Sequence, residues 1–171
     1  MGKYISVIIL LLSFACSAFA DVYNSPTNLE NISRYIPKMG SIKCKFKQEK
    51  YLKNIEKPLV SSGDFEFAEK NGVYFYTKYP VQSTVDYTNK NYKQINDVVN
   101  AVSTKKYSRL EKEFNFYYEG NSDKWTLGMK PKKTSNAYNY VSSITIDGTD
   151  YINKINIIQT NGNKTVLWFT K

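Results

Sequence analysis

The stretch Ile42-Lys43-Cys44-Lys45-Phe46-Lys47-Gln48 alternates apolar and cationic side chains, and Asp64-Phe65-Glu66-Phe67 alternates acidic and aromatic ones. A period of two residues is typical of a strand that has one buried face and one solvated face. We therefore expect two strands whose aromatic rings share a buried face and whose charged side chains share the opposite, solvated face.

The same period continues through most of the chain, and turn signals such as Asn71-Gly72 and Asn161-Gly162 separate the strands. Because hairpins follow one another, the sequence predicts an α+β fold with an antiparallel, mostly meander sheet that forms an open (half) β-barrel. The ten expected strands cover residues 41–52, 58–69, 72–79, 82–88, 91–96, 115–119, 125–130, 141–147, 150–159 and 164–169.

Two segments depart from the strand period. Ser25-Pro26 has the residue types of an N-cap and first helical position, and Gly40 those of a residue after a helix. Apolar residues at three- and four-residue spacing between them predict a helix over 26–39. Two further short helices are expected within 97–113, broken near Ser103-Thr104.

The first twenty residues have the composition of a secretory signal peptide. Lys3 precedes an apolar segment over 5–15, and Ala18-Phe19-Ala20 resembles a cleavage site. We expect cleavage after Ala20 and a single mature domain over residues 21–171. Lipid anchoring at Cys16 is the alternative, because small residues around that cysteine resemble a lipoprotein processing site.

The composition excludes several kinds of active site. The chain has no histidine, which removes Ser-His and Cys-His catalysis and the commonest metal ligand. After cleavage Cys44 is the remaining cysteine, so no internal disulfide can form. We therefore expect neither a metal nor a cofactor.

Asp64 and Glu66 are the best catalytic pair that the sequence offers, since two carboxylates on one strand face can divide acid and base work. Lysines on the preceding strand are placed to form cross-strand ion pairs with them, which favours a solvated charged face. We expect a protein that is not an enzyme.

The mature chain keeps a formal net charge of +8, because the signal segment contains one charged residue, Lys3. This excess favours an anionic partner. Export argues against nucleic acid, which we do not expect as a partner. One hypothesis is a structural or interaction module that docks on an anionic membrane or protein surface through Lys43, Lys45 and Lys47.

The apolar face allows two arrangements. The helices either seal a dry core against the sheet or form a lid over a pocket that accepts an aliphatic chain. The patterning alone leaves both open. The candidates for the inward-pointing face are Phe46, Phe65, Phe67, Phe75, Val85, Phe116, Trp125 and Leu127.

Several motifs, in order along the chain, resemble the bacterial periplasmic lipoprotein carrier LolA and its divergent LolA-like branch. In the first half they are Phe46-x-Gln48, Pro58-Leu59-x-Ser61-x-Gly63-x-Phe65-x-Phe67 and Gly72-Val73-Tyr74-Phe75-x-Thr77. In the second half they are Phe114-x-Phe116, Trp125-x-Leu127-x-Met129-x-Pro131, Ser143-Ile144-x-Ile146-x-Gly148 and Asn161-Gly162-Asn163-Lys164-Thr165.

The resemblance implies a monomeric periplasmic carrier of a lipoprotein or another acylated lipid, working between an inner-membrane donor and an outer-membrane acceptor. It also implies that the eight inward-pointing residues form a hydrophobic ligand cavity. Typical carriers have an Arg-Pro pair that ties the sheet to the lid, and Lys70 is the candidate for that gating role. The expected lid residues are Leu29, Ile32, Ile36, Val99, Val102 and Leu110.

Overall fold

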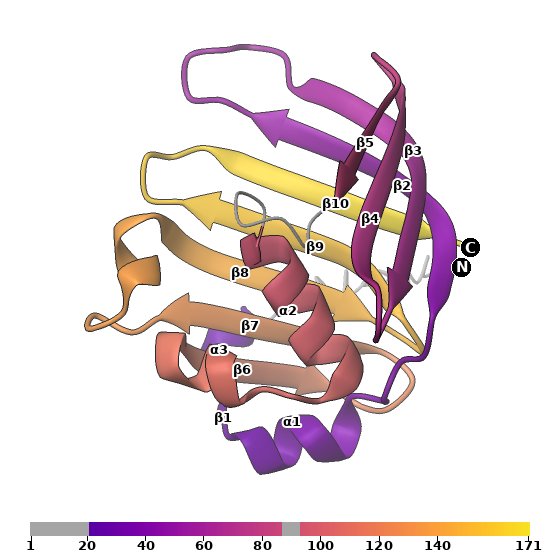
Figure 1. Cartoon of the computed structure of the whole chain (residues 1–171). Coiled ribbons are helices and arrows are strands. Elements are labelled where there is room, and N and C mark those ends of the chain that lie inside the picture. The colour runs from indigo at the N-terminus through magenta and orange to yellow at the C-terminus, as the bar shows by residue number, and fades with distance from the viewer. Residues whose placement is uncertain (1–20, 87–92) are drawn as a thin grey trace, which may run out of the picture.

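In the computed structural model, which describes residues 21–86 and 93–171, ten strands form one curved sheet with helices against one side (Figure 1). The strands are β1 (Pro26–Thr27), β2 (Ile42–Tyr51), β3 (Leu59–Ala68), β4 (Gly72–Tyr79), β5 (Ser83–Asp86), β6 (Phe114–Gly120), β7 (Trp125–Pro131), β8 (Val141–Gly148), β9 (Ile152–Gln159) and β10 (Lys164–Thr170). The α-helices are α1 (Leu29–Tyr35), α2 (Lys93–Thr104) and α3 (Ser108–Glu113), and two 3₁₀ helices are η1 (Val22–Asn24) and η3 (Asn136–Asn139).

The sheet is antiparallel throughout, and its strand order is β1-β6-β7-β8-β9-β10-β2-β3-β4-β5. Two meanders, β2 to β5 and β6 to β10, join where β10 pairs with β2. The edge strands β1 and β5 do not meet, so the sheet stays open. The predicted fold class, an open antiparallel half-barrel with helices, is confirmed.

The strand order also explains why helices lie across one face of the sheet. The chain leaves β5 at one edge of the sheet and resumes at β6, next to the other edge. The connection must therefore cross the whole sheet, and α2 and α3 lie on this crossing (Figure 1). We call the face that they cover the inner face and the opposite one the outer face.

The N-terminal helix is shorter than predicted. Pro26 and Thr27 form strand β1 beside β6 instead of the first helical turn, a position that suits proline because an edge strand need not use every N–H group. Helix α1 starts after Asn28, whose side chain accepts a hydrogen bond from the Asn31 N–H at 3.0 Å. It ends at Tyr35 because Ile36 precedes Pro37 and is extended.

The strand predicted over 91–96 is wrong for its described part, since α2 begins at Lys93. The sequence spacing of Ile95, Val98, Val99 and Val102 suits one helical face. This segment forms a helix because the chain crosses the sheet here and needs one apolar face to pack against it. The break expected between the two helices near Ser103-Thr104 is present. Helix α2 ends at Thr104, and Lys105 after it has a φ of 60°. The turn predicted at 88–91 lies outside the described residues.

The inner face carries a continuous core. The Phe65 ring lies 5.0 Å from Phe75 and 4.6 Å from Phe169, and Phe46 meets Phe75 edge to face at 4.8 Å. These contacts join β2, β3, β4 and β10. Offset and edge-to-face ring pairs of this kind add to the stabilisation that burial itself supplies.

At the other half of the inner face, Trp125 on β7 lies over Gly148 on β8. The indole Nε1 donates a hydrogen bond of 2.8 Å to the Thr149 carbonyl oxygen. A Cβ on Gly148 would lie 2.1 Å from the indole ring, so the glycine leaves the space that the ring occupies. The Trp125 side chain is 1% exposed, and the hydrogen bond supplies the partner that a buried indole N–H needs.

The outer face carries the charged side chains that the sequence predicts there. Lys43 pairs with Glu66 at 3.3 Å and Lys45 pairs with Asp64, in register across β2 and β3. Among the described helices, none combines the length and the hydrophobicity that a membrane crossing needs.

Candidate functional site

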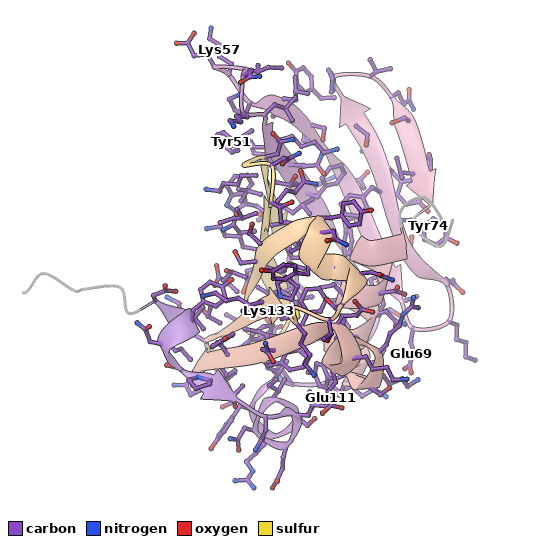
Figure 2. The ribbon with its side chains drawn as sticks, turned by 90° about the vertical axis from the view of Figure 1, so that its left-hand side faces the viewer. Tyr51, Lys57, Glu69, Tyr74, Glu111 and Lys133 are labelled. Carbon is purple, nitrogen blue, oxygen red and sulfur yellow. The ribbon has the colours of Figure 1, made fainter. Side chains whose placement is uncertain are left out.

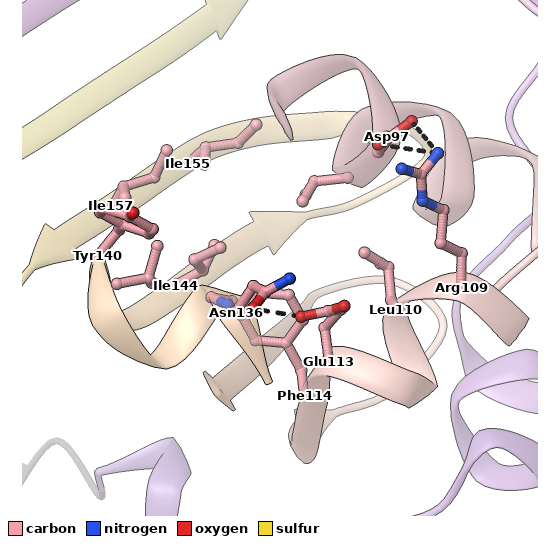
Figure 3. Close-up of a pocket in the computed structure, with 13 residues that line it drawn as sticks. Asp97, Arg109, Leu110, Glu113, Phe114, Asn136, Tyr140, Ile144, Ile155 and Ile157 are labelled. Atoms are coloured by element: carbon pink, nitrogen blue, oxygen red, sulfur yellow. Dashed lines mark hydrogen bonds and ion pairs between the residues drawn. The ribbon is translucent and has the colours of Figure 1, made fainter. Parts of the chain in front are cut away.

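An apolar pocket lies between the helices and the inner face of the sheet (Figure 3). Its volume is about 260 Å³. Helices α2 and α3 form one wall, β8 and β9 form the floor, and η3 closes one end. The described residues that line it are Asp97, Val98, Arg109, Leu110, Glu113, Phe114, Asn136, Ala137, Tyr140, Val141, Ile144, Ile155 and Ile157.

The floor of the pocket is built from branched aliphatic residues. Ile144 on β8 and Ile157 on β9 lie opposite each other in the ladder, and Ile155 lies two residues before Ile157 on the same face. β-branched side chains suit a pleated surface because their χ1 angles are restricted. The floor is therefore a stiff apolar surface with no polar group of its own.

Polar groups are confined to the rim. Arg109 on α3 pairs with Asp97 on α2, with 3.1 Å between Nη1 and Oδ2. Glu113 accepts a long hydrogen bond of 3.5 Å from the Ala137 N–H at the start of η3. An apolar interior with a few polar groups at its edge is the usual composition of a small-molecule site.

The predicted cavity residues lie on the inner face, as expected, yet they do not line this pocket. Seven of the eight are buried in the core, and Val85 packs against it partly buried. Phe65 lines two other hollows, and Phe116 lines a third. The periodicity correctly indicates which face these residues share. It does not indicate where the helices leave space above that face.

The predicted lid residues all pack against the sheet. Ile32, Ile36, Val99, Val102 and Leu110 are buried in the core, and Leu29 is partly buried beside them. Leu110 is the member of this set that also lines the pocket. The three helices thus cover the inner face as a layer, with the pocket left under α2 and α3.

Glu69, the residue before the gating candidate Lys70, joins the turn between β3 and β4 to two segments that flank the helices. The Glu69 carboxylate accepts a hydrogen bond of 2.9 Å from Lys106, between α2 and α3, and lies 3.6 Å from Lys38, which follows α1. The hydrogen bond from Lys106, with the charges of Lys106 and Lys38, holds the pKa of Glu69 below its ordinary value. Lys70 is exposed on the same turn.

Glu69 was not among the predicted site residues, because the family resemblance implies a cation at this turn. The sequence does contain the complementary signal, which is a carboxylate on the turn and the adjacent cations Lys105 and Lys106 between two expected helices. Lys105 donates to the Ser33 carbonyl oxygen at 2.7 Å, so this linker also contacts α1. We call Glu69, Lys38 and Lys106 the Glu69 cluster.

The candidate catalytic pair occupies a solvated face. Hydrogen bonds from Lys45 and Lys78 hold the pKa of Asp64 below its ordinary value, whereas a general acid at neutral pH needs a raised pKa. The three lysines of the alternative hypothesis, an interaction module that docks on an anionic surface, are also paired: Lys43 with Glu66, Lys45 with Asp64 and Lys47 with Glu49. These pairs lower the net positive charge that this face presents.

No group of three or more potential metal-ligating side chains occurs in the part of the chain that the structure describes. Cys44 is a free, half-buried thiol on β2, and burial raises its pKa. A raised thiol pKa disfavours the nucleophilic thiolate form.

No family model matches the chain, and no curated protein matches it. Among solved structures, a LolA superfamily protein from Nitrosomonas europaea is similar over 84% of this chain and 90% of that chain. The two are 8% identical, with a TM-score of 0.28. A likeness of this extent does not decide the family of this protein.

Proposed function

We propose that the protein is a non-enzymatic periplasmic carrier that binds an acyl chain of a lipoprotein or another lipid between its helices and its open sheet. It delivers this cargo towards the outer membrane, receiving it from an inner-membrane donor and passing it to an acceptor. The observation that carries the proposal is the apolar pocket of about 260 Å³ over the isoleucines of β8 and β9.

The size of the pocket supports a mechanism in which the helices move. Typical ligand pockets measure about 300–1,000 Å³. The pocket of about 260 Å³ therefore holds part of a long acyl chain while the helices are closed. A longer chain must displace α2 or α3 from the inner face, where Val99, Val102 and Leu110 pack in the core.

Energetics favour the same mechanism. Burying sixteen carbons at about 0.8 kcal/mol per CH₂ yields roughly 12 kcal/mol before any cost is subtracted. Separating buried side chains of the helices from the sheet offsets part of this gain, and the offset makes release possible. The ion pairs of the Glu69 cluster are exposed and individually weak, so they permit opening.

The proposal is tested with the protein stripped of lipid and titrated with a fluorescent fatty acid. We expect saturable binding that unlabelled palmitate displaces. Amide hydrogen exchange in α2 and α3 should be faster at saturation than in the lipid-free protein, because the bound chain separates these helices from the sheet. Absence of displaceable binding, with the fold intact by circular dichroism, would falsify the carrier function.

A further inference from the structure

One end of the sheet gathers three connections, of seven, nine and four residues. Strands β2, β7 and β9 run towards it, so the segments 52–58, 132–140 and 160–163 all lie there. The Lys53 N–H donates to the Asn163 side chain at 3.0 Å, and the Thr160 N–H donates to the Tyr140 carbonyl oxygen at 3.2 Å. We call these segments, with the flanking residues 50–51, 59 and 164, the loop end (Figure 2 labels Tyr51, Lys57 and Lys133 within it).

Large apolar side chains are exposed at the loop end. Leu59 is 54% exposed and Tyr140 is 63% exposed, and Tyr51, Ile55 and Tyr138 are exposed as well. In the described turns at the opposite end, 69–71, 121–124 and 149–151, no large apolar residue is exposed to this degree. Exposed apolar groups gathered in one region mark an interaction surface.

The charge of the loop end is strongly positive. It contains a single carboxylate, Glu56, whereas the three turns at the opposite end contain three carboxylates and two lysines. Lys164 also lies over the Tyr51 ring, with 5.6 Å from Nζ to the centroid. The six lysines of the loop end are Lys50, Lys53, Lys57, Lys132, Lys133 and Lys164.

The loop end also borders the apolar pocket. Tyr140 lines the pocket beside Ile157 and is at the same time the most exposed tyrosine of the loop end (Figure 3). A molecule that lies against the loop end therefore contacts the residue that closes one side of the pocket.

We propose that the loop end docks on a lipid bilayer that contains anionic phospholipids. Ile55 and Leu59 enter the boundary between headgroups and acyl chains, the tyrosines lie at headgroup level, and the lysines contact phosphate groups. This combination, apolar tips surrounded by lysines, fits an anionic bilayer better than an acidic protein surface, which offers no apolar layer beneath its charges. The inference does not depend on acyl-chain carriage.

Vesicle flotation tests the docking. The protein exported by a bacterial host, with its N-terminus checked by mass spectrometry, is mixed with vesicles of phosphatidylglycerol and phosphatidylcholine or with phosphatidylcholine alone. We expect binding to the anionic vesicles at low salt, and loss of it at high salt. The Lys53→Gln/Lys57→Gln variant should bind about 25-fold more weakly, since each lysine near an anionic surface contributes about fivefold. Ile55→Ser/Leu59→Ser should also bind more weakly.

The matched control is Lys124→Gln/Lys171→Gln, which removes the same charge near the opposite end and should bind like the unchanged protein. Equal binding by the loop-end variants and the control overturns the proposal, as does failure of the unchanged protein to bind anionic vesicles. The fluorescent fatty-acid affinity of each variant is measured in parallel. Lost vesicle binding by the loop-end variants, with unchanged fatty-acid affinity, supports docking. If docking fails, the fatty-acid titration still tests the carrier function.

Discussion

The Glu69 carboxylate on the β3–β4 turn accepts a hydrogen bond of 2.9 Å from Lys106, in the linker between α2 and α3. This contact joins one edge region of the sheet to the helices that cross it, and Lys38 extends it to the segment after α1 at 3.6 Å. The Glu69 cluster is therefore positioned to favour the closed arrangement of the helices.

The first prediction concerns Glu69→Gln. Because the variant removes the charge that both lysines face, we expect faster amide hydrogen exchange in α2 and α3 and faster uptake of a fluorescent fatty acid. Asp150→Asn is the matched control, since the Asp150 carboxylate lies 3.1 Å from Lys171 and neither residue belongs to a helix. Identical exchange in the Glu69 variant and the unchanged protein would contradict the role of the cluster.

The second prediction is a pH dependence of the same contact. The pKa of Glu69 is lowered in the folded protein, so the contact is fully present above the ordinary glutamate pKa and is lost as the pH falls through the lowered value. Exchange in α2 and α3, corrected for intrinsic rates, should be constant well above the ordinary glutamate pKa of 4.5 and should rise as the pH falls below it. The rise should be smaller in Glu69→Gln, and an equal rise in both proteins would count against the contact.

The third prediction separates the pocket from the neighbouring surface. Ile157→Trp places a large ring in the pocket that Ile157 lines, so we expect fatty-acid affinity to fall about tenfold, the equivalent of about two buried CH₂ groups. Ile158→Trp changes the next residue, which is exposed, and should retain the affinity. Equal losses in both variants would place the binding site elsewhere.

The fourth prediction tests the packing of Trp125 over Gly148. A Cβ on Gly148 would lie 2.1 Å from the indole, so Gly148→Ala should lower the free energy of unfolding by about 1–3 kcal/mol. A Cβ on Gly40 would meet no atom within 4 Å, so Gly40→Ala should be neutral or stabilising by up to about 1 kcal/mol. Urea denaturation measures both, and a stable Gly148 variant would show that the ring can move.

The fifth prediction concerns Tyr107, whose hydroxyl is buried without a hydrogen-bond partner among the described residues. Burial also raises the pKa of this phenol. Tyr107→Phe should therefore raise the free energy of unfolding by about 1 kcal/mol. Tyr23→Phe should lower it by about the same amount, because the Tyr23 hydroxyl donates to the Ile144 carbonyl oxygen at 3.0 Å. A destabilised Tyr107 variant would reveal a partner for the hydroxyl.

Local chemistry predicts a large part of this fold. The alternation at Ile42–Gln48 and Asp64–Phe67 correctly separates the two faces of β2 and β3, and the lysine–carboxylate pairs across them follow from that register. The turn glycines Gly72 and Gly162 do adopt positive φ, as hairpin turns require. Such features depend on neighbouring residues, so they can be read along the chain.

The N-terminal segment shows where local reading fails. Ser25-Pro26 has the composition of a helix start, yet Pro26 pairs with Tyr117 because β6 offers an unpaired edge. The helix end at Tyr35 could have been predicted from Pro37, which disfavours the helical conformation of the residue before it. A sheet edge competes with a local helix signal only after the sheet exists.

The alternating stretch by itself determined that β2 and β3 have one apolar and one charged face, because side-chain direction alternates with every residue of a strand. Only the tertiary structure decided that Phe46, Phe65 and Phe67 pack in a filled core while the pocket lies over β8 and β9. The reason is that the space above each strand depends on where the crossing helices lie, and that path follows from the strand order of the whole sheet.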